Sequence, residues 1–318
     1  MLEKSQPLKV STLSFTVPSF AKINWSLRIL GRRPDGYHEI RTLMQTVSLH
    51  DELHFEANNN REVILSSNDT LLPTDESNLI VRAASAVRDR FRVSSGASIR
   101  LEKRIPTKAG LGGASSNAAV TLVALARLWN LKINLSELIE IAATLGADVP
   151  FFLIGGRVLA TGTGTEVSSV PDDNRANTYV LIVTPQATVA TIDAYRALRV
   201  PALTSISPDS ILSSSRADAI SLLVDPSTLR NDFEDAIFES EPEIERVKMA
   251  LNDAGATGSL LAGSGSSVFG IFENEYLQER AAKELRAEIG WRVFPAVTIS
   301  RREYLQALGP CGVPLSHS

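Results

Sequence analysis

The chain has 318 residues, more than the ~100–200 residues usual for one domain, so the length predicts two domains that share a cleft. Hydrophobic residues make up 44% and charged residues 21%, and the formal net charge of -4 gives no basic field for a nucleic-acid backbone. The single cysteine excludes an internal disulfide, the chain start carries no signal-peptide core, and no apolar run reaches the ~18 residues of a membrane span, so we expect a cytoplasmic protein without nucleic-acid or membrane partners.

Two alternating stretches predict that the chain begins with β-strands. In KINWSLRI, apolar residues at positions 23, 25, 27 and 29 alternate with polar ones, which is the period of a half-buried strand. Lys22 and Asn24 therefore share its polar face. The turn-forming GRRPDGYH follows, and a second alternating run carries apolar residues at 47, 49, 53 and 55.

Helical patterns come next. Ser77 is the expected N-cap of a helix with apolar residues at 80, 83, 84, 87 and 91, and SIRLEKRI alternates as a strand. A helix that begins near Ser115 is indicated by its apolar face at 118, 122, 125 and 129. Asn134 and Glu137 form an expected capping box for a further helix that ends near Gly146, which places Asp148 in a loop.

The second half of the chain reads as an α+β unit. GRVLATGTGTEV predicts a strand and turn, and the polar SSVPDDNRANT is a candidate domain junction. YVLIV and SSVFGIF are expected buried strands, EIERVKMAL is an expected helix, and SISPDSILSSSR is an expected exposed loop.

The segment IPTKAGLGGASSN, residues 105–117, is called the glycine loop below. Its glycines allow positive φ and close approach to a ligand, and the helix that follows directs unpaired N–H groups into the loop. Such a place binds anions, phosphate above all. Ala114 after Gly113 excludes a Walker A loop, and glycines at 110, 112 and 113 do not fit the dinucleotide pattern. Glycine spacing alone leaves both phosphate binding and a merely tight turn open.

The glycine loop resembles the P-x-x-x-G-L-G-[SG]-[SA]-S-[SN] phosphate loop of the GHMP superfamily, named for galactokinase, homoserine kinase, mevalonate kinase and phosphomevalonate kinase. Further segments resemble, in the same order along the chain, the 4-diphosphocytidyl-2-C-methyl-D-erythritol kinase family. These are AKINWSLRILGRRPDGYHEI from residue 21, LGADVPFFL from 145, NDFED from 231 and LLAGSGSSVFGIF from 260. The motifs span most of the chain.

The resemblance implies an α+β, two-domain GHMP kinase fold. An N-terminal domain like domain 2 of ribosomal protein S5 would cover residues 1–170, a ferredoxin-like C-terminal domain residues 171–318, and a cleft would lie between them. The implied reaction is ATP-dependent phosphorylation of the 2-hydroxyl of 4-diphosphocytidyl-2-C-methyl-D-erythritol. Its products are the 2-phosphate and ADP, in the non-mevalonate route to isoprenoid precursors.

The residues implied to bind ATP are those of the glycine loop: Pro106, Thr107, Lys108, Ala109, Gly110, Leu111, Gly112, Gly113, Ala114, Ser115 and Ser116. Two of them depart from the family, which often carries a small residue at Lys108 and glycine at Ala114. Lys108 either adds a cation near the phosphates or is a solvated side chain. Mg²⁺ is implied by the ATP chemistry, and the hydroxyl of Ser115 or Ser116 either serves the cation or a phosphate, or caps the helix.

By resemblance, Lys22 and Asp148 are the catalytic pair. Asp148 would accept or orient the proton of the attacking hydroxyl, and Lys22 would hold that aspartate and stabilise developing charge. Without the family, Lys22 would read as a solvated strand lysine and Asp148 as a turn former or N-cap.

The remaining candidate residues indicate which acceptor the protein binds. The resemblance puts Tyr37 against the cytosine ring, His38 on its polar edge and Asn24 against the acceptor, and it suggests a second aromatic wall at Tyr195 after Thr191. The run AGSGSS, residues 262–267 and called the glycine turn below, would help hold phosphates through Gly263, Ser264 and Gly265, or is only a tight turn. NDFED is expected to open a helix and is given no chemistry.

Two rival functions remain from the sequence. One is another GHMP small-molecule kinase that acts on homoserine or a mevalonate derivative, against which DGYH argues. The other is a non-catalytic nucleotide-binding homologue, against which the presence of both Lys22 and Asp148 argues.

Overall fold

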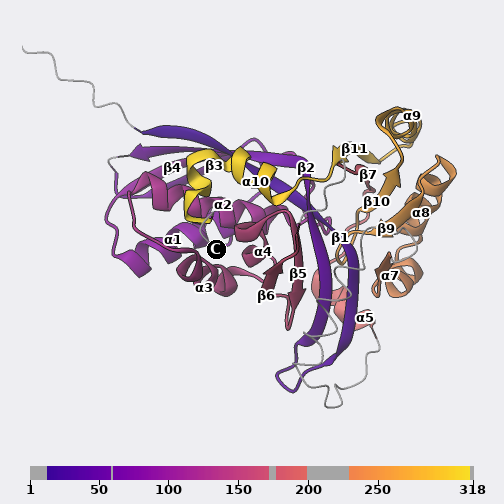
Figure 1. Cartoon of the computed structure of the whole chain (residues 1–318), viewed down its shortest axis with the longest axis horizontal. Helices are drawn as coiled ribbons and strands as arrows, with labels where there is room; N and C mark the ends of the chain where they lie inside the picture. The colour runs from indigo at the N-terminus through magenta and orange to yellow at the C-terminus, as the bar shows by residue number, and fades with distance from the viewer. Residues whose placement is uncertain (1–12, 59, 172–176, 199–228, 316–318) are drawn as a thin grey trace, which may run out of the picture.

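The computed structural model describes residues 13–58, 60–171, 177–198 and 229–315, which form two β-sheets with helices around them (Figure 1). The first sheet and helices α1 to α4 lie at one end, and the second sheet with α7 to α9 lies at the other. The long strands β1 and β2 run beside both (Figure 1). The stretch expected as a serine-rich loop, residues 205–216, lies outside the described residues.

The first sheet has seven strands in the order β3-β4-β2-β1-β8, with β5 paired to β2 and β6 paired to β5. Its strands are β1 (Ser14–Arg32), β2 (His38–Asn58), β3 (Val63–Ser67), β4 (Gly96–Glu102), β5 (Arg157–Thr161), β6 (Glu166–Ser169) and β8 (Arg230–Asn231). β1 and β2 form the expected hairpin, and their turn contains Pro34, Asp35 and Gly36, the last with φ of 88°. β8 pairs in parallel with β1, so a short strand from the second half of the chain completes this sheet.

Helices cover one face of the first sheet. They are α1 (Leu79–Phe91), α2 (Gly113–Leu128), α3 (Leu135–Leu145) and α4 (Val149–Ile154). α2 is buried along most of its length and is the centre of the main hydrophobic core. The chain end, α10 (Arg301–Leu308) with the 3₁₀ segment η2 (Gly309–Leu315), returns to the same core (Figure 1). There the buried Tyr304 hydroxyl donates a hydrogen bond to the carbonyl of Phe152.

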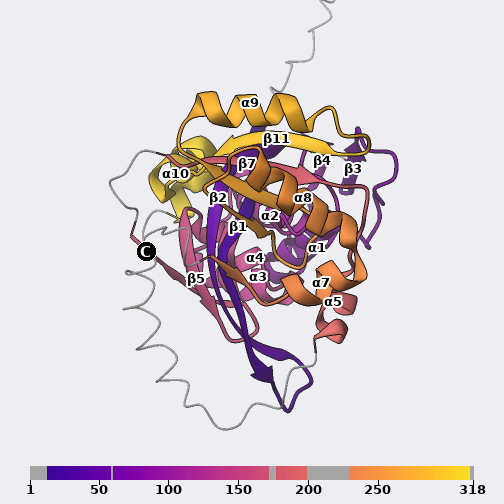
Figure 2. The ribbon, with the colours of Figure 1, turned by 90° about the vertical axis from the view of Figure 1, so that its right-hand side faces the viewer.

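The second sheet is antiparallel, in the order β11-β7-β10-β9. Its strands are β7 (Tyr179–Thr184), β9 (Gly258–Leu261), β10 (Val268–Phe272) and β11 (Arg292–Val297), and the nearby helices are α5 (Thr191–Ala197), α7 (Glu234–Ser240), α8 (Pro242–Asp253) and α9 (Glu275–Leu285). α7, α8 and α9 lie on the side of this sheet away from β1 (Figures 1 and 2). The sequence β7-α8-β9-β10-α9-β11 with this strand order is the expected ferredoxin-like arrangement.

Several element boundaries follow from the sequence. The capping box of Asn134 and Glu137 is present, and α3 ends at Leu145 with Gly146 as its C-cap, as expected. One helix start differs by a residue: Asn78, not Ser77, caps α1 by accepting a hydrogen bond from the N–H of Ile80. The next helix, α2, begins at Gly113, near the expected Ser115.

Two features differ from the expectations. Asp148 lies in a turn between α3 and α4, as expected, but it is also the N-cap residue of α4, an unexpected helix whose six residues are all buried. A fully apolar stretch this short has no amphipathic period, so the sequence pattern could not distinguish it from a strand or loop. The strand around Lys22 is also not half-buried. Its apolar face packs against the second sheet and its polar face is covered as well, so that Lys22 and Asn24 are only 3% and 1% exposed.

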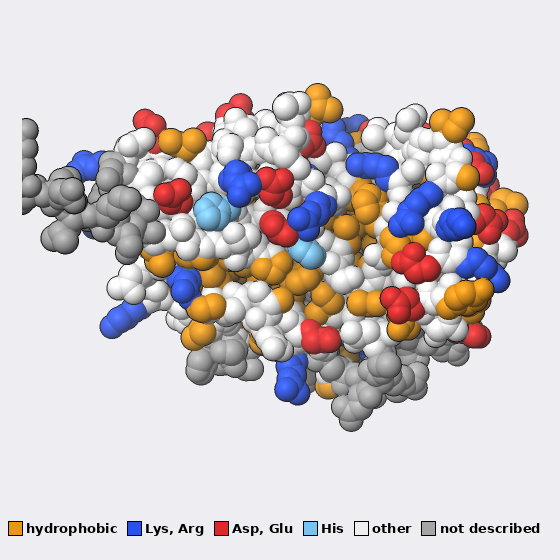
Figure 3. Space-filling model, turned by 90° about the horizontal axis from the view of Figure 1, so that it is seen from above, with side chains coloured by type: hydrophobic (Ala, Val, Ile, Leu, Met, Phe, Trp, Pro, Cys, Tyr) orange, Lys and Arg blue, Asp and Glu red, His pale blue; other side chains and the backbone are white. Residues whose placement is uncertain are grey.

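The expected division at residue 170 falls between β6 and β7, where the chain passes from the first sheet to the second. The domain boundary at residue 170 stays a prediction, because β8 and α10 follow it in the chain but pack with the first sheet and its core. On the face seen in Figure 3, acidic and basic side chains are interspersed rather than gathered by sign. Within the described ranges, no helix has both the length and the apolar character needed to cross a bilayer.

Candidate active site

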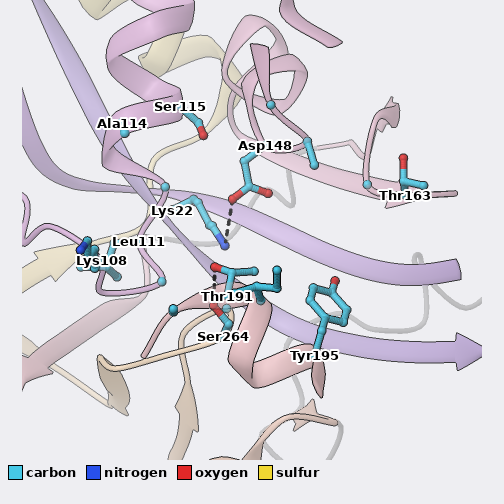
Figure 4. A pocket seen from close by; sticks show the side chains of 18 of the residues that line it. Lys22, Lys108, Leu111, Ala114, Ser115, Asp148, Thr163, Thr191, Tyr195 and Ser264 are labelled. Atoms are coloured by element: carbon cyan, nitrogen blue, oxygen red, sulfur yellow. Dashed lines mark hydrogen bonds and ion pairs between the residues drawn. The ribbon is translucent and has the colours of Figure 1, made fainter. Parts of the chain in front are cut away.

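A cleft of about 1820 Å³ takes its walls from both halves of the chain (Figure 4). The first half contributes the glycine loop, β1, the β1–β2 turn and the residues before α4. The second half contributes α5 and the glycine turn. The structure brings the predicted site residues together, because all of them except Ser116 line this cleft. Ser116 is fully buried, and its Oγ accepts a hydrogen bond from Ser19 Oγ.

The glycine loop requires its glycines for both conformation and space. Gly110 and Gly112 have φ of 75° and 69°, a region that residues with a Cβ rarely adopt. A Cβ on Gly110 would lie 1.8 Å from the carbonyl oxygen of Ala262, and one on Gly112 would lie 2.9 Å from the Phe152 ring. Gly112 caps α2 without a side-chain hydrogen bond, so N–H groups of the first turn remain for a ligand.

Lys108 also has a left-handed backbone, with φ of 54°. Glycine would adopt this conformation at a lower cost than lysine does. The Lys108 side chain is exposed and lies apart from Lys22 and Asp148 at the other end of the loop (Figure 4).

Lys22 and Asp148 face each other in the cleft, with 3.6 Å between Lys22 Nζ and Asp148 Oδ2 (Figure 4). The lysine side chain is only 4% exposed, whereas the aspartate side chain is 38% exposed and can be reached by a ligand. Asp148 occupies an N-cap position but its carboxylate makes no capping hydrogen bond. The alternative that Asp148 only caps a helix is therefore not supported, and the carboxylate is directed to the ammonium.

A backbone contact holds Lys22 against the glycine loop. The N–H of Lys22 donates to the carbonyl of Leu111 at 3.0 Å, and Lys22 Cγ lies 3.1 Å from where a Cβ on Gly112 would be. The ammonium also donates to Asn24 Oδ1 at 2.9 Å. One strand thus places its lysine beside the backbone of the glycine loop and the Asp148 carboxylate at once.

Aromatic side chains form the far end of the cleft. The His38 and Tyr195 rings stack with centroids 4.7 Å apart, and Tyr195 meets Phe233 edge-on at 4.9 Å. Tyr37 is 66% exposed beside them and lines the same cleft. Burial, aided by the cation of Arg32, lowers the pKa of His38 below 6.5, so the ring is neutral at pH 7. Burial, with a smaller contribution from the Asp148 carboxylate, raises the pKa of Tyr195 to about 12.

The glycine turn closes the cleft opposite the glycine loop. Ser264 and Thr191 hydroxyls lie 3.1 Å apart and below Lys22 in the view of Figure 4. The N–H of Gly263, which the sequence assigned to a phosphate, donates instead to Asn24 Oδ1 at 3.0 Å. The N–H of Gly265 donates to the carbonyl of Ala262 at 2.9 Å, so of the three residues expected to hold a phosphate only Ser264 keeps its backbone N–H for that role.

Two polar groups around the site were not found from the sequence. Asp51 is fully buried and accepts hydrogen bonds from Lys103 Nζ at 2.6 Å, from Asn117 Nδ2 and from the backbone N–H groups of Arg104 and Ile105. Lys103 itself lines the cleft, and burial lowers its pKa. Because Asp51 and Lys103 are 52 residues apart in sequence, only the pairing of β2 with β4 reveals their contact. The second group, around Asn231, is described below.

The residues at the cleft fit a magnesium ion held together with a nucleotide. Mg²⁺ is commonly bound by one or two carboxylates, substrate phosphates and water rather than by a protein cage. Asp148 and the half-exposed Ser115 supply one carboxylate and one hydroxyl near the start of α2 (Figure 4). Over the described ranges, no group of three or more His, Cys, Asp or Glu side chains is placed to hold a metal without such a ligand.

Comparisons with known proteins agree with this geometry. Residues 78–156 match the N-terminal domain of the GHMP kinases, and residues 216–289 match the C-terminal domain of the same kinases. Together with the two sheets and the cleft between a glycine loop and a lysine–aspartate pair, these matches define an ATP-dependent small-molecule kinase of the GHMP fold.

Relatives narrow the assignment. The 4-diphosphocytidyl-2-C-methyl-D-erythritol kinase of Prosthecochloris aestuarii is 41% identical over 292 residues, which cover 89% of this chain and 98% of that protein. The kinase of the same name from Lachnoclostridium phytofermentans is 36% identical over 272 residues, covering 85% and 92%. The chain therefore belongs to the 4-diphosphocytidyl-2-C-methyl-D-erythritol kinase family.

Solved structures give the same picture. A crystal structure of 4-(cytidine 5'-diphospho)-2C-methyl-D-erythritol kinase superposes with a TM-score of 0.72 at 33% identity, covering 89% of this chain and 99% of the other. A homoserine kinase from Cytophaga hutchinsonii superposes with a TM-score of 0.68 at 22% identity, which shows a shared fold alone.

Proposed function

We infer that this chain transfers the γ-phosphoryl group of ATP to the 2-hydroxyl of 4-diphosphocytidyl-2-C-methyl-D-erythritol. The products are ADP and the 2-phosphate, in the non-mevalonate route to isoprenoid precursors. The observation that carries the inference is the position of the Lys22–Asp148 pair, in one cleft between the glycine loop and the aromatic cluster of Tyr37, His38 and Tyr195. This is the place where a phosphoryl group must pass from nucleotide to acceptor.

The glycine loop binds the ATP phosphates. The left-handed glycines and the uncapped start of α2 support this role, because several N–H groups can each share part of the triphosphate charge. The exposed Lys108 adds a cation at the far end of the loop. Asp148 and Ser115 would hold Mg²⁺ together with ATP oxygens, and the ion would supply positive charge beside the transferred phosphoryl group.

Asp148 accepts the proton of the acceptor hydroxyl as the hydroxyl oxygen bonds to the γ-phosphorus and the bond to the ADP oxygen breaks. Lys22 orients the carboxylate through their 3.6 Å ion pair and stabilises the charge on the transferred group. Its burial supports this assignment, since an ammonium held away from water interacts more strongly with a nearby phosphoryl oxygen.

The acceptor lies with its cytosine ring among Tyr37, His38 and Tyr195, its phosphates near Ser264, and its methylerythritol near Asn24 and Thr191. A neutral His38 can hydrogen-bond a base edge without placing a charge beside it. The hydroxyl of Thr191, bonded to Ser264, supports a polar lining where phosphates would pass.

The test supplies the purified chain with ATP, Mg²⁺ and one of three acceptors: 4-diphosphocytidyl-2-C-methyl-D-erythritol, mevalonate or homoserine. We expect ADP release only with the cytidine-linked acceptor, matched by one equivalent of its 2-phosphate. ADP release with mevalonate or homoserine instead would overturn the acceptor assignment, and release with none of the three would favour a non-catalytic homologue.

A further inference from the structure

The Asn231 side chain is a buried polar group for which the reaction has no evident use. It is 5% exposed, does not line the cleft, and belongs to the NDFED motif. Its Nδ2 donates two hydrogen bonds, to the carbonyls of Leu261 at 2.8 Å and Gly263 at 2.7 Å, and its Oδ1 accepts from the N–H of Phe233. Its two amide hydrogens are thus committed to the end of β9 and to Gly263 in the glycine turn.

The same motif is attached to β1, the strand that carries Lys22. Asn231 pairs with Leu27 in the parallel β1–β8 ladder, and the N–H of Asp232 donates to the carbonyl of Leu27 at 3.0 Å. The Asp232 carboxylate accepts from the N–H of Ile29 at 2.8 Å. The motif therefore connects the glycine turn of the second sheet to the catalytic strand of the first.

A second amide completes the connection from the other side. Gly263, whose carbonyl is held by Asn231, donates its own N–H to Asn24 Oδ1, and the same oxygen accepts from Lys22 Nζ at 2.9 Å. Space is tight here, since a Cβ on Gly263 would lie 3.2 Å from Lys22 Nζ and 2.9 Å from the carbonyl oxygen of Gly110. A shift of the turn towards these atoms would therefore press on the lysine or on the glycine loop.

Thr42 determines which way the Asn24 amide faces. The Thr42 hydroxyl gives its only hydrogen to the carbonyl of Ser26 at 2.8 Å, so towards Asn24 it can only accept. Asn24 must present Nδ2 to Thr42, at 2.8 Å, and its oxygen to Lys22 and Gly263. The Thr42 hydroxyl therefore fixes the orientation of the Asn24 amide.

We propose that Asn231 and Thr42 are positioning residues that fix the Lys22 ammonium through Gly263 and Asn24, a set called the amide bridge. Asn231 holds the glycine turn, the turn holds the Asn24 oxygen, and that oxygen holds the ammonium 3.6 Å from Asp148. The proposal rests on the proposed phosphoryl transfer. It adds that the second half of the chain sets the geometry of a lysine in the first half.

The test compares Asn231→Leu with Gln278→Leu. Gln278 is the matched control, because it is a 3% exposed amide in the same half of the chain and its Nε2 likewise donates to two backbone carbonyls, those of Val180 and Ala296. Gln278 lies away from the cleft, on α9. Asn231→Leu loses three buried hydrogen bonds and Gln278→Leu loses two, so a purely structural role predicts a lower melting temperature in both variants, somewhat lower in Asn231→Leu, and the same activity.

If the amide bridge positions Lys22, Asn231→Leu lowers kcat by about 10- to 100-fold, the range expected when a catalytic group is misplaced by up to an ångström. The KM for ATP stays within about threefold, since ground-state binding is retained. Gln278→Leu keeps the wild-type kcat at a temperature where both variants are folded. Equal kcat values for the two variants would overturn the proposal.

Thr42→Val supplies a second test that removes little packing. It frees the Asn24 amide to turn its nitrogen towards Lys22, so kcat falls, whereas its two lost hydrogen bonds lower the melting temperature only as those of Gln278→Leu do. A double-mutant cycle then tests the connection, because Asn231→Leu made in an Asn24→Ala background must cost little further activity. If each substitution instead lowered kcat independently, so that the two factors multiplied in the double variant, the amide bridge would be contradicted. A wild-type chain without kinase activity would instead contradict the proposed function, so the two failures are distinguishable.

Discussion

Gly110 of the glycine loop packs directly against the carbonyl of Ala262 in the glycine turn, leaving no room for a side chain between them. A Cβ there would lie 1.8 Å from that oxygen, and φ of 75° adds backbone strain. We expect Gly110→Ala to raise the KM for ATP and lower kcat by at least about tenfold, because the loop must move away from the turn and from Lys22.

The control is Gly255→Ala. Gly255 also has a positive φ, 98°, but a Cβ there would meet only the Arg280 guanidinium at an ordinary 3.5 Å. This variant carries the backbone cost of roughly 1–2 kcal/mol without the clash and keeps its activity. Equal kinetic losses in both variants would show that strain alone, not the contact between the two loops, is responsible.

Lys108 combines an unfavourable backbone with a cation, and two substitutions separate these effects. Lys108→Gln keeps the left-handed cost and removes the charge, whereas Lys108→Gly removes both. If the cation serves the nucleotide phosphates, both variants raise the KM for ATP by severalfold, and only Lys108→Gly unfolds at a higher denaturant concentration. If the KM for ATP is unchanged in both variants, Lys108 is a solvated side chain with no role in nucleotide binding.

His38 makes acceptor binding depend on pH. Its pKa is lowered below 6.5 by burial and by Arg32, so the ring is neutral at pH 7 and gains a proton only in more acidic solution. If the neutral ring binds the cytosine, the KM for the acceptor is constant above pH 6.5 and rises as pH falls through the lowered pKa. Arg32→Gln removes one of the two causes, so the midpoint moves to higher pH. An NMR titration of His38 checks this directly, and a midpoint at or above 6.5 in the wild type is incompatible with the assignment.

The Asp51–Lys103 pair is expected to stabilise the strand that leads into the glycine loop. Its side chains are 0% and 7% exposed, so Asp51→Ala leaves a buried ammonium unpaired and costs about 3–5 kcal/mol of unfolding free energy. Asp193→Ala, which breaks the exposed pair with Arg196, costs less than about 1 kcal/mol. Urea unfolding of both variants measures the two losses of unfolding free energy. Similar losses would mean that the buried Asp51–Lys103 pair contributes no more stability than the exposed pair.

Local interactions of the fold could be read from the sequence, and long-range ones could not. The Asn134–Glu137 capping box joins residues three apart, and the turn at Gly36 needs only its own backbone, so both were predictable. α4 escaped prediction because a short, fully buried helix has no polar face to mark its period.

The site was predictable where a motif carried it and not where tertiary contacts did. Lys22 and Asp148 were paired through family resemblance, although 126 residues of chain separate them, and the structure brings them to 3.6 Å. Asn231 was part of a recognised motif, but its partners at 261 and 263 are known only once β8 pairs with β1. The contact between Asp51 and Lys103 depends in the same way on the register of β2 against β4.

The most direct measurement of the central claim is the single-turnover rate of phosphoryl transfer to 4-diphosphocytidyl-2-C-methyl-D-erythritol in Asp148→Asn and Lys22→Met, with saturating ATP and acceptor. A proton acceptor and a preorganised cation each contribute about 10²–10⁴-fold, so we expect the rate to fall by that factor in each variant while thermal unfolding stays cooperative. Near-wild-type transfer rates in both folded variants would contradict the account.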